Sequence, residues 1–213
     1  MEEAFWQDRW QNQKIGFHEP APNARLIAHF EALAVPKGAA VFVPLCGKSL
    51  DIDWLLAQEH PVIGIEFHEA AVQEVFERLG RSAEVTQNGD LRRYAAGDLT
   101  LFCGDFFALT AAQVPEVAAV FDRAALVAIA PEQRQAYVDH LTHLCPQVPT
   151  LLVTFDYDQS QMQGPPFSVP ADMVDQFYGG DVMRRLLQSD PITSPPKIRG
   201  LGTEDVYLLA PVA

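Results

Sequence analysis

Four residues that can contact a ligand each stand at the carboxyl end of a short apolar run. Leu45 closes the run VFVPL, Glu66 closes VIGIE, Asp105 follows LTLFCG and Arg123 follows VAAVFD. Runs of this kind, rich in β-branched and aromatic residues, predict buried strands. Open α/β sheets bind their ligands outside the carboxyl ends of the strands. The four positions therefore predict one ligand site at one edge of a sheet.

The spacing between a glycine turn and Glu66 indicates what this ligand contains. Gly47 follows the first apolar run, a helical pattern comes next, and Glu66 ends the second run roughly 20 residues later. Strand, glycine turn, helix and strand in this order form the βαβ unit of a nucleotide-binding sheet. An acidic residue at the end of the second strand is placed to accept hydrogen bonds from two ribose hydroxyls. An ordinary buried βαβ unit with Glu66 at the surface is the alternative.

The turn itself lacks the common phosphate-binding signatures. The residues Gly47-Lys48-Ser49 imitate the end of a P-loop, but Phe42 stands where the first glycine of a P-loop is required. The dinucleotide fingerprint G-x-G-x-x-G is also absent, which weakens the reading as an NAD-dependent oxidoreductase. A cofactor with a ribose but without a phosphate remains, and S-adenosylmethionine fits this description.

Two more strand ends offer polar groups, each with a plainer alternative. The carboxylate of Asp105 and the backbone amide of Phe106 can bind an adenine through its exocyclic amine and a ring nitrogen. A turn-capping role for Asp105 is equally consistent with the sequence. Asp122 and Arg123 are adjacent, so one of them faces the ligand edge and the other is a candidate surface charge.

Composition narrows the class of partner. The chain of 213 residues is 48% hydrophobic, which suits one α/β domain spanning residues 1–213. The net charge of −13 argues against a nucleic-acid partner, because phosphate contacts need clustered Lys and Arg, although a locally basic pocket can still hold an anion. The apolar runs are too short to span a membrane, and the acidic N-terminus is unlike a signal peptide. We expect a cytoplasmic monomer that acts on a small molecule.

The cysteines and histidines give no sign of a disulfide framework or a metal site. Cys46, Cys103 and Cys145 are widely spaced and form no C-x-x-C pair. The default reading is that they are small buried hydrophobes, and a reactive Cys46 at the mouth of the turn is the alternative. His140 and His143 share a predicted helix but have no third ligand nearby in the sequence, so no metal is expected.

Elements that alternate along the chain must position these residues. Two helices, over residues 3–12 and 23–34, precede the first strand and form a predicted helical lid over residues 1–35. In this lid Phe5, Trp6 and Trp10 share one helix face, which either caps the core or excludes water from the site. Further helices are expected over residues 69–79, 131–144 and 170–178, and further strands over 62–65, 91–94, 99–103, 117–121, 150–155, 182–187 and 206–209.

The strand over 150–155 leads into a segment that can form a substrate rim. Asp156 stands at its polar end, and a stiff loop with Pro166 and one aromatic residue, Phe167, follows. A rim that contacts the acceptor is the functional interpretation, with Asp156 or Asp158 as a weak candidate proton acceptor. A plain connector is the alternative.

The sequence resembles the thiopurine S-methyltransferase family, most closely its bacterial members. The blocks that carry the resemblance are FWQDRW with GFHE at 5–19, VPLCGKSLDIDWL at 43–55, VIGIE at 62–66, FDRAALVAI at 121–129 and TFDYDQSQMQGPPFSV at 154–169. The resemblance implies a class I, Rossmann-like methyltransferase fold of the α/β class. Such a fold has a seven-stranded, mostly parallel sheet with helices on both faces and one antiparallel strand near the edge. It also implies S-adenosylmethionine as the cofactor.

The resemblance assigns roles to particular residues. Trp10, Leu45, Glu66 and Arg123 match the family's cofactor-contacting positions, and Phe17 would cover the site together with Trp10. Arg123 would also reach the acceptor, and its charge would favour the acceptor's anionic form, which makes it the predicted catalytic residue. The implied reaction is methyl transfer to the sulfur of thiopurines and aromatic thiols, with selenium and tellurium compounds as further acceptors. A cofactor-binding protein without turnover stays open as an alternative.

Overall fold

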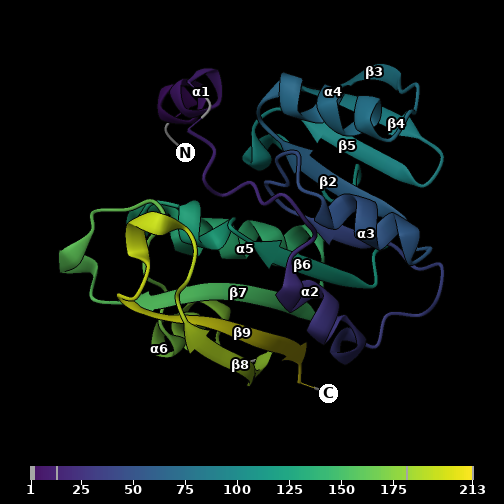
Figure 1. Cartoon of the computed structure of the whole chain (residues 1–213). Coiled ribbons are helices and arrows are strands. Elements are labelled where there is room, and N and C mark those ends of the chain that lie inside the picture. The colour runs from purple at the N-terminus through teal and green to yellow at the C-terminus, as the bar shows by residue number, and fades with distance from the viewer. Residues whose placement is uncertain (1–2, 13, 181, 213) are drawn as a thin grey trace.

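The computed structural model describes residues 3–12, 14–180 and 182–212. The strands of this part of the chain form one nine-stranded sheet (Figure 1). The strand order is β3-β4-β5-β2-β1-β6-β7-β9-β8. The strands are β1 (Val41–Val43), β2 (Val62–Glu66), β3 (Glu84–Asn88), β4 (Leu91–Ala96), β5 (Leu99–Cys103), β6 (Ala119–Arg123), β7 (Thr150–Tyr157), β8 (Val182–Pro191) and β9 (Gly202–Pro211). Neighbouring strands β5, β2, β1, β6 and β7 are all parallel, whereas β4 and β9 run against the others.

The predicted fold class is confirmed, and the strand number is corrected. The expected seven strands are present from β5 to β8, and the hairpin β3–β4 adds two more at the far edge, so two strands rather than one run antiparallel. The sequence showed only one arm of this hairpin, at residues 91–94. Its other arm, β3, is almost wholly exposed, and its one apolar residue, Val85, is 51% exposed, so no apolar alternation marks it as a strand.

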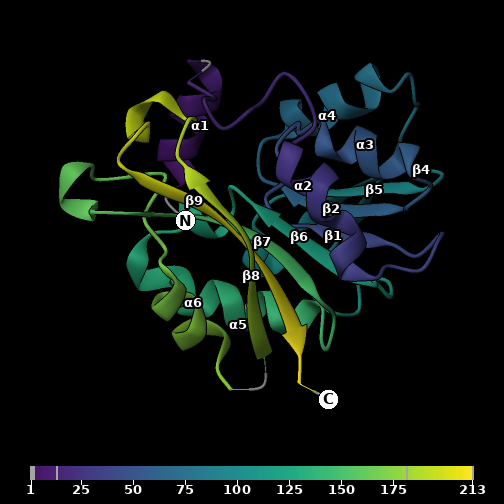
Figure 2. The same ribbon diagram turned by 60° about the horizontal axis from the view of Figure 1, so that its bottom comes forward.

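Helices cover both faces of the sheet, as Figure 2 shows. The helices are α1 (Glu3–Gln11), α2 (Ala24–His29), α3 (Asp51–Ala57), α4 (Glu69–Arg78), α5 (Arg134–Leu144) and α6 (Ala171–Tyr178). The first core cluster joins α5 and α6 to one face, and the second joins α2, α3 and α4 to the other. Successive residues of β1 alternate between these clusters, because strand side chains point to opposite faces: Phe42 lies in the first, and Val41 and Val43 lie in the second.

The predicted helix over residues 23–34 is shorter and more irregular than expected. It begins after Asn23, whose side chain accepts a hydrogen bond from the Arg25 N–H, and the helix α2 ends at His29. A 3-10 turn, Phe30–Leu33, completes it. Of its apolar residues, Leu26 is fully buried, whereas Ile27 is 49% exposed. None of the helices in the described part of the chain is long and apolar enough to cross a membrane.

Candidate functional site

The turn after β1 joins the carboxyl ends of β1 and β2. The Cys46 N–H donates to the Ile65 carbonyl at 2.9 Å, which ties the turn to the neighbouring strand. Leu45 and Gly47 both have positive φ, 44° and 53°, so the chain reverses tightly at this point. A non-glycine residue in this backbone region is strained and persists only where its surroundings hold it. The turn thus lies at the sheet edge, with the N–H groups of Cys46 and Gly47 bound to β2.

Glu66 lies at the floor of the first of two cavities at this edge. Its side chain is 7% exposed, and its two carboxylate oxygens accept hydrogen bonds from the backbone N–H groups of Gly47 (2.9 Å) and His68 (2.7 Å). Burial raises the pKa of Glu66 from 4.5 to about 7 despite these bonds. Carboxylate oxygens have further lone pairs, so Glu66 can still accept bonds from a ligand's hydroxyl groups.

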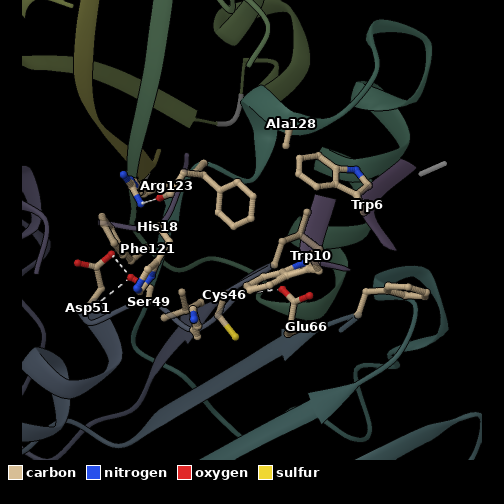
Figure 3. Close-up of a pocket in the computed structure, with 17 residues that line it drawn as sticks. Trp6, Trp10, His18, Cys46, Ser49, Asp51, Glu66, Phe121, Arg123 and Ala128 are labelled. Atoms are coloured by element: carbon tan, nitrogen blue, oxygen red, sulfur yellow. Dashed lines mark hydrogen bonds between the residues drawn. The ribbon is translucent and has the colours of Figure 1, made fainter. Parts of the chain in front are cut away.

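Trp10 of α1 covers this cavity (Figure 3). Its ring stacks on His68, with centroids 5.1 Å apart and 7° between the planes, and meets Phe17 edge-on at 5.5 Å. A methyl group added at Gly47 would contact the Trp10 ring at 3.6 Å, so the ring lies directly over the turn. The space that remains beneath it is about 70 Å³.

Arg123, at the end of β6, ties the N-terminal segment to the sheet edge. Its Nη1 donates to the Phe17 carbonyl at 2.7 Å, and its Nη2 forms an ion pair with Glu19 at 2.7 Å. The other carboxylate oxygen of Glu19 accepts from the side-chain amide of Asn23 at 3.0 Å. The Asn23 N–H in turn donates to buried Asp51 at 2.6 Å. Arg123 is therefore held in a continuous polar network that reaches α3.

His18 contributes a polar atom with no partner in the described part of the chain. Its ring lines the first cavity, and the buried Nδ1 makes no hydrogen bond there. Burial, together with the nearby charges of Lys48, Arg78 and Arg123, lowers the pKa of His18, so the ring is neutral near pH 7. A buried polar atom of this kind is normally satisfied by a ligand or by water.

A second, larger cavity of about 600 Å³ lies beside the first. Its walls come from the N-terminal segment, from the ends of β6 and β7, and from two proline-containing loops around Pro166 and Pro195. Both cavities are lined by Trp6, Phe17 and Arg123, so these side chains form a shared wall. Two ligands that both contacted this shared wall would lie next to each other.

The structure brings most of the predicted site residues together. The first cavity is lined by Trp10, Leu45, Glu66, Phe17 and Arg123. The last two also line the second cavity, where Pro166 joins them.

Asp105 and Phe106, the predicted adenine contacts, line neither cavity. The Asp105 carboxylate accepts a hydrogen bond from the Phe107 N–H at 3.1 Å and so caps a short 3-10 turn. The Phe106 ring is buried and packs 5.0 Å from the Tyr137 ring. The geometry thus fits the turn-capping alternative for Asp105. Contact of Asp105 and Phe106 with an adenine stays a prediction.

Asp156 and Phe167, two of the predicted substrate contacts, also lie outside the cavity walls. Val153 and Phe155 of β7 line the second cavity, and the next residue, Asp156, does not, since neighbouring strand residues point to opposite faces. The Phe167 ring packs against the guanidinium of Arg134, with 5.3 Å between the guanidinium carbon and the ring centroid. The Phe167 ring also lies against Gly164 of the proline loop, and its contact with a substrate remains a prediction.

Cys46 and Cys145 are buried as expected, whereas Cys103 is only partly buried, and its thiol donates to the Phe67 carbonyl at 3.7 Å. Cys46 lines the first cavity, yet burial and the neighbouring Glu66 raise the pKa of its thiol well above the usual value. A neutral thiol is a poor nucleophile, so the structure gives no support to a reactive Cys46. Within residues 3–12, 14–180 and 182–212, no group of three His, Cys, Asp or Glu side chains is arranged to hold a metal ion.

Several lining residues were not singled out by the sequence. They are His18 of the GFHE block, Arg9 and Lys14 of the N-terminal segment, and the loop 194–197 between β8 and β9. The sequence did carry a signal for His18, because it lies between Phe17 and Glu19 in a block that resembles a known family. The loop gave no signal, because it reaches the site only through the pairing of β9 with β7.

Comparison with known proteins gives a consistent family relationship. The family model described as thiopurine S-methyltransferase matches residues 1–209. A thiopurine S-methyltransferase of Xanthobacter autotrophicus is 46% identical over 210 residues, which cover 98% of this chain and 99% of the relative. One of Marinobacter nauticus is 41% identical over 216 residues, with 98% and 99% covered.

Solved structures of methyltransferases share the fold. A 1,6-didemethyltoxoflavin-N1-methyltransferase of Burkholderia thailandensis with bound S-adenosylhomocysteine has a TM-score of 0.63 and 14% identity, covering 99% of this chain and 87% of that chain. A magnesium protoporphyrin IX methyltransferase of Synechocystis, also with S-adenosylhomocysteine, has a TM-score of 0.61 and 15% identity, covering 99% and 96%. At these identities the likeness concerns the fold alone.

Proposed function

The chain belongs to the thiopurine S-methyltransferase family and is an S-adenosylmethionine-dependent methyltransferase, and from this premise we propose that it methylates the sulfur of thiopurines and other aromatic thiols. The observation that carries the proposal is the pair of cavities that share a wall at Arg123. Group transfer needs two ligands held next to each other in a fixed orientation. The two adjoining cavities at the sheet edge supply such an arrangement.

The polar groups that line the first cavity suit the ribose and methionine parts of the cofactor. We assign the ribose hydroxyls to the Glu66 carboxylate, the methionine end to the backbone around Leu45, the cover to Trp10, and the adenine to Asp105 and Phe106. The unpartnered Nδ1 of His18 and the buried carboxylate of Glu66 are polar groups that such a ligand would satisfy.

The cover must move for the cofactor to enter. The 70 Å³ under Trp10 has room for a few water molecules but not for a nucleoside. We therefore assign the role of a lid to α1, which carries Trp10 and would open to admit the cofactor and close over it to exclude water. The rest of the expected lid, from α2 onward, packs in the second core cluster and would stay in place.

The proposed reaction depends more on the alignment of the acceptor sulfur with the cofactor's methyl group than on acid–base catalysis. When bound, the cofactor supplies a methyl group whose bond to the sulfonium sulfur breaks, leaving its electron pair there, as the acceptor sulfur bonds the carbon. A thiolate is already a strong nucleophile, so we assign no general base. Arg123 places a positive charge at the shared wall, and this charge lowers the pKa of an acceptor thiol. Phe17 and Trp6 shield the wall from water.

The proposal has finer parts that rest on the family resemblance. Selenium and tellurium compounds are proposed as second acceptors, which would give tellurite resistance. We also propose that the protein acts in the cytoplasm, which its free cysteines support, and that it acts as a monomer. Membership in a methyltransferase family leaves no support for the NAD-dependent alternative.

The test is methyl transfer from labelled S-adenosylmethionine to 6-mercaptopurine, thiophenol, selenite and tellurite, with products identified by mass. Methylated thiols are the expected result, and Arg123→Ala should reduce turnover by about ten-fold or more, since each 1.4 kcal/mol is a factor of ten in rate. Saturable cofactor binding without any methylated product would support the cofactor-binding alternative and overturn the proposed reaction.

A further inference from the structure

Within the described part of the chain, the walls of the second cavity carry charge of one sign only. Every described ionisable side chain that lines it is basic: Arg9, Lys14, Arg123 and Lys197. The whole chain, in contrast, has 28 acidic residues against 15 Lys and Arg and a net charge of −13. A basic pocket in a strongly acidic protein concentrates positive potential where a small anion would enter.

These basic side chains have hydrogen-bond donors that the described part of the protein does not use. Arg123 is paired with Glu19, and Lys14 lies 3.7 Å from Asp8 at the surface. The Arg9 guanidinium donates from Nη1 to the Lys14 carbonyl at 3.4 Å, and its buried Nε has no partner in the described part of the chain.

Lys197 has the least compensated charge. No hydrogen bond or ion pair of its ammonium group occurs within residues 3–12, 14–180 and 182–212, and its side chain is exposed at the rim of the cavity. The positive charge around the cavity is therefore only partly neutralised by the protein itself.

The rest of the wall suits a flat organic ring. Aromatic side chains of Trp6, Phe17 and Phe155 face the cavity together with Pro166 and Pro195. A volume of about 600 Å³ lies within the range of pockets that bury small organic ligands and is far larger than a bare oxyanion requires. Aromatic walls bind ring faces through stacked or edge-on contacts.

We propose, on the basis of the proposed function, that the preferred acceptor is an aromatic thiol that carries a second, anionic group such as a carboxylate. Its sulfur lies against Arg123 at the wall shared with the cofactor cavity. Its anionic group points toward Arg9, Lys14 and Lys197, which line the second cavity only. These three side chains are specificity-determining, and they take no part in the methyl transfer itself.

The experiment compares two acceptors of equal size, 3-mercaptobenzoate and 3-mercaptobenzamide. The acid should show a kcat/KM about ten-fold higher than the amide, because several partly exposed charge contacts each contribute modestly. The preference should shrink as salt is raised, since exposed charges are screened. Lys197→Gln and Arg9→Gln should each lower the rate with the acid about three-fold and lower the rate with the amide much less, so that the preference for the acid shrinks. Lys37→Gln, a surface change outside both cavities, is the matched control and should alter neither rate.

The outcomes separate this inference from the proposed function. If both acceptors are methylated at equal kcat/KM, the anionic preference is overturned and the methyltransferase proposal stands. If neither is methylated, the proposed function fails, and binding decides the inference instead. Binding of benzoate and benzamide is then measured by tryptophan fluorescence in the presence of S-adenosylhomocysteine, because Trp6 lines the cavity. Tighter binding of benzoate, weakened by Lys197→Gln, would support the inference, and equal binding would overturn it.

Discussion

Glu19 and Arg123 form an ion pair, with 2.7 Å between Oε1 and Nη2, across the junction of the N-terminal segment and the sheet. Arg123 ends the central strand β6, and Glu19 belongs to the segment that follows α1. The pair is partly shielded from solvent, and the second oxygen of Glu19 is held by Asn23. We infer that Glu19 is a positioning residue, which fixes the guanidinium at the wall between the two cavities.

Replacing Glu19 should therefore affect turnover without unfolding the protein. Glu19→Ala is expected to lower kcat/KM for 6-mercaptopurine by about ten-fold, since a misplaced cation costs about 1.4 kcal/mol of transition-state stabilisation. Glu19→Gln keeps an acceptor oxygen for Arg123 and should recover most of the loss. Kinetics and thermal unfolding are measured on both variants. Equal losses in the two variants, accompanied by a lower Tm, would indicate a structural role instead.

Trp10→Ala tests the cover over the first cavity. The Trp10 ring stacks on His68 and lies over Gly47, so its loss should open the cavity to water. An aromatic contact of this kind contributes about 0.5–1.5 kcal/mol, which predicts up to about ten-fold weaker binding of S-adenosylhomocysteine by calorimetry. Trp10→Phe should bind nearly as tightly as the wild type. Unchanged affinity in Trp10→Ala would remove Trp10 from the cofactor site.

The site could be predicted where it depends on local patterns. Glu66 and Arg123 end buried strands, and Leu45 lies in the turn directly after β1. Parallel strands put their carboxyl ends at one edge, so the meeting of these residues follows from the strand pattern alone. Asp105 follows β5 at the same edge, but its carboxylate is engaged by the Phe107 N–H. Whether a strand-end carboxylate faces a ligand or its own turn depends on local backbone geometry, which residue type does not reveal.

The acceptor cavity could not be predicted for a different reason. Lys197 and Pro195 belong to the loop between β8 and β9, and they reach the cavity because β9 inserts antiparallel between β7 and β8. That insertion is a long-range pairing with no sequence signal of its own. The exposed strand β3 escaped prediction similarly, because a strand without a buried face has no apolar alternation.

Gly64 in the middle of β2 should not tolerate a larger residue. A methyl group at this position would meet the Leu101 side chain at 2.9 Å, the Cys46 sulfur at 3.0 Å and the Val43 carbonyl at 3.1 Å. Gly64→Ala is therefore expected to destabilise the protein by about 1–3 kcal/mol, the usual cost of overpacking a core. Urea unfolding measures the change. Gly180→Ala, where an added methyl group meets nothing within 4 Å, is the control and should be near neutral.

The raised pKa of Glu66 predicts how stability depends on pH. Burial lifts this pKa from 4.5 to about 7, so between these values the folded state holds a proton that the unfolded state releases. Stability contributed by the neutral carboxyl is then fully present below pH 4.5 and is lost as the pH rises through 7. Glu66→Gln, which cannot ionise, should lack this dependence. Relative to the wild type, the variant should gain up to about 3 kcal/mol between pH 4.5 and 8 in denaturant titrations.

The ionisation of Glu66 should also control the affinity for the cofactor. A ribose hydroxyl donates more strongly to a carboxylate than to a neutral carboxyl group, so wild-type affinity for S-adenosylhomocysteine should increase as the pH rises from 6 to 8. Binding should also lower the pKa of Glu66, because hydrogen bonds to the charged form favour it. In Glu66→Gln the affinity should be weaker and flat over this range. Calorimetry at several pH values distinguishes the cases, and a wild-type affinity as flat as the variant's would remove Glu66 from the ribose contact.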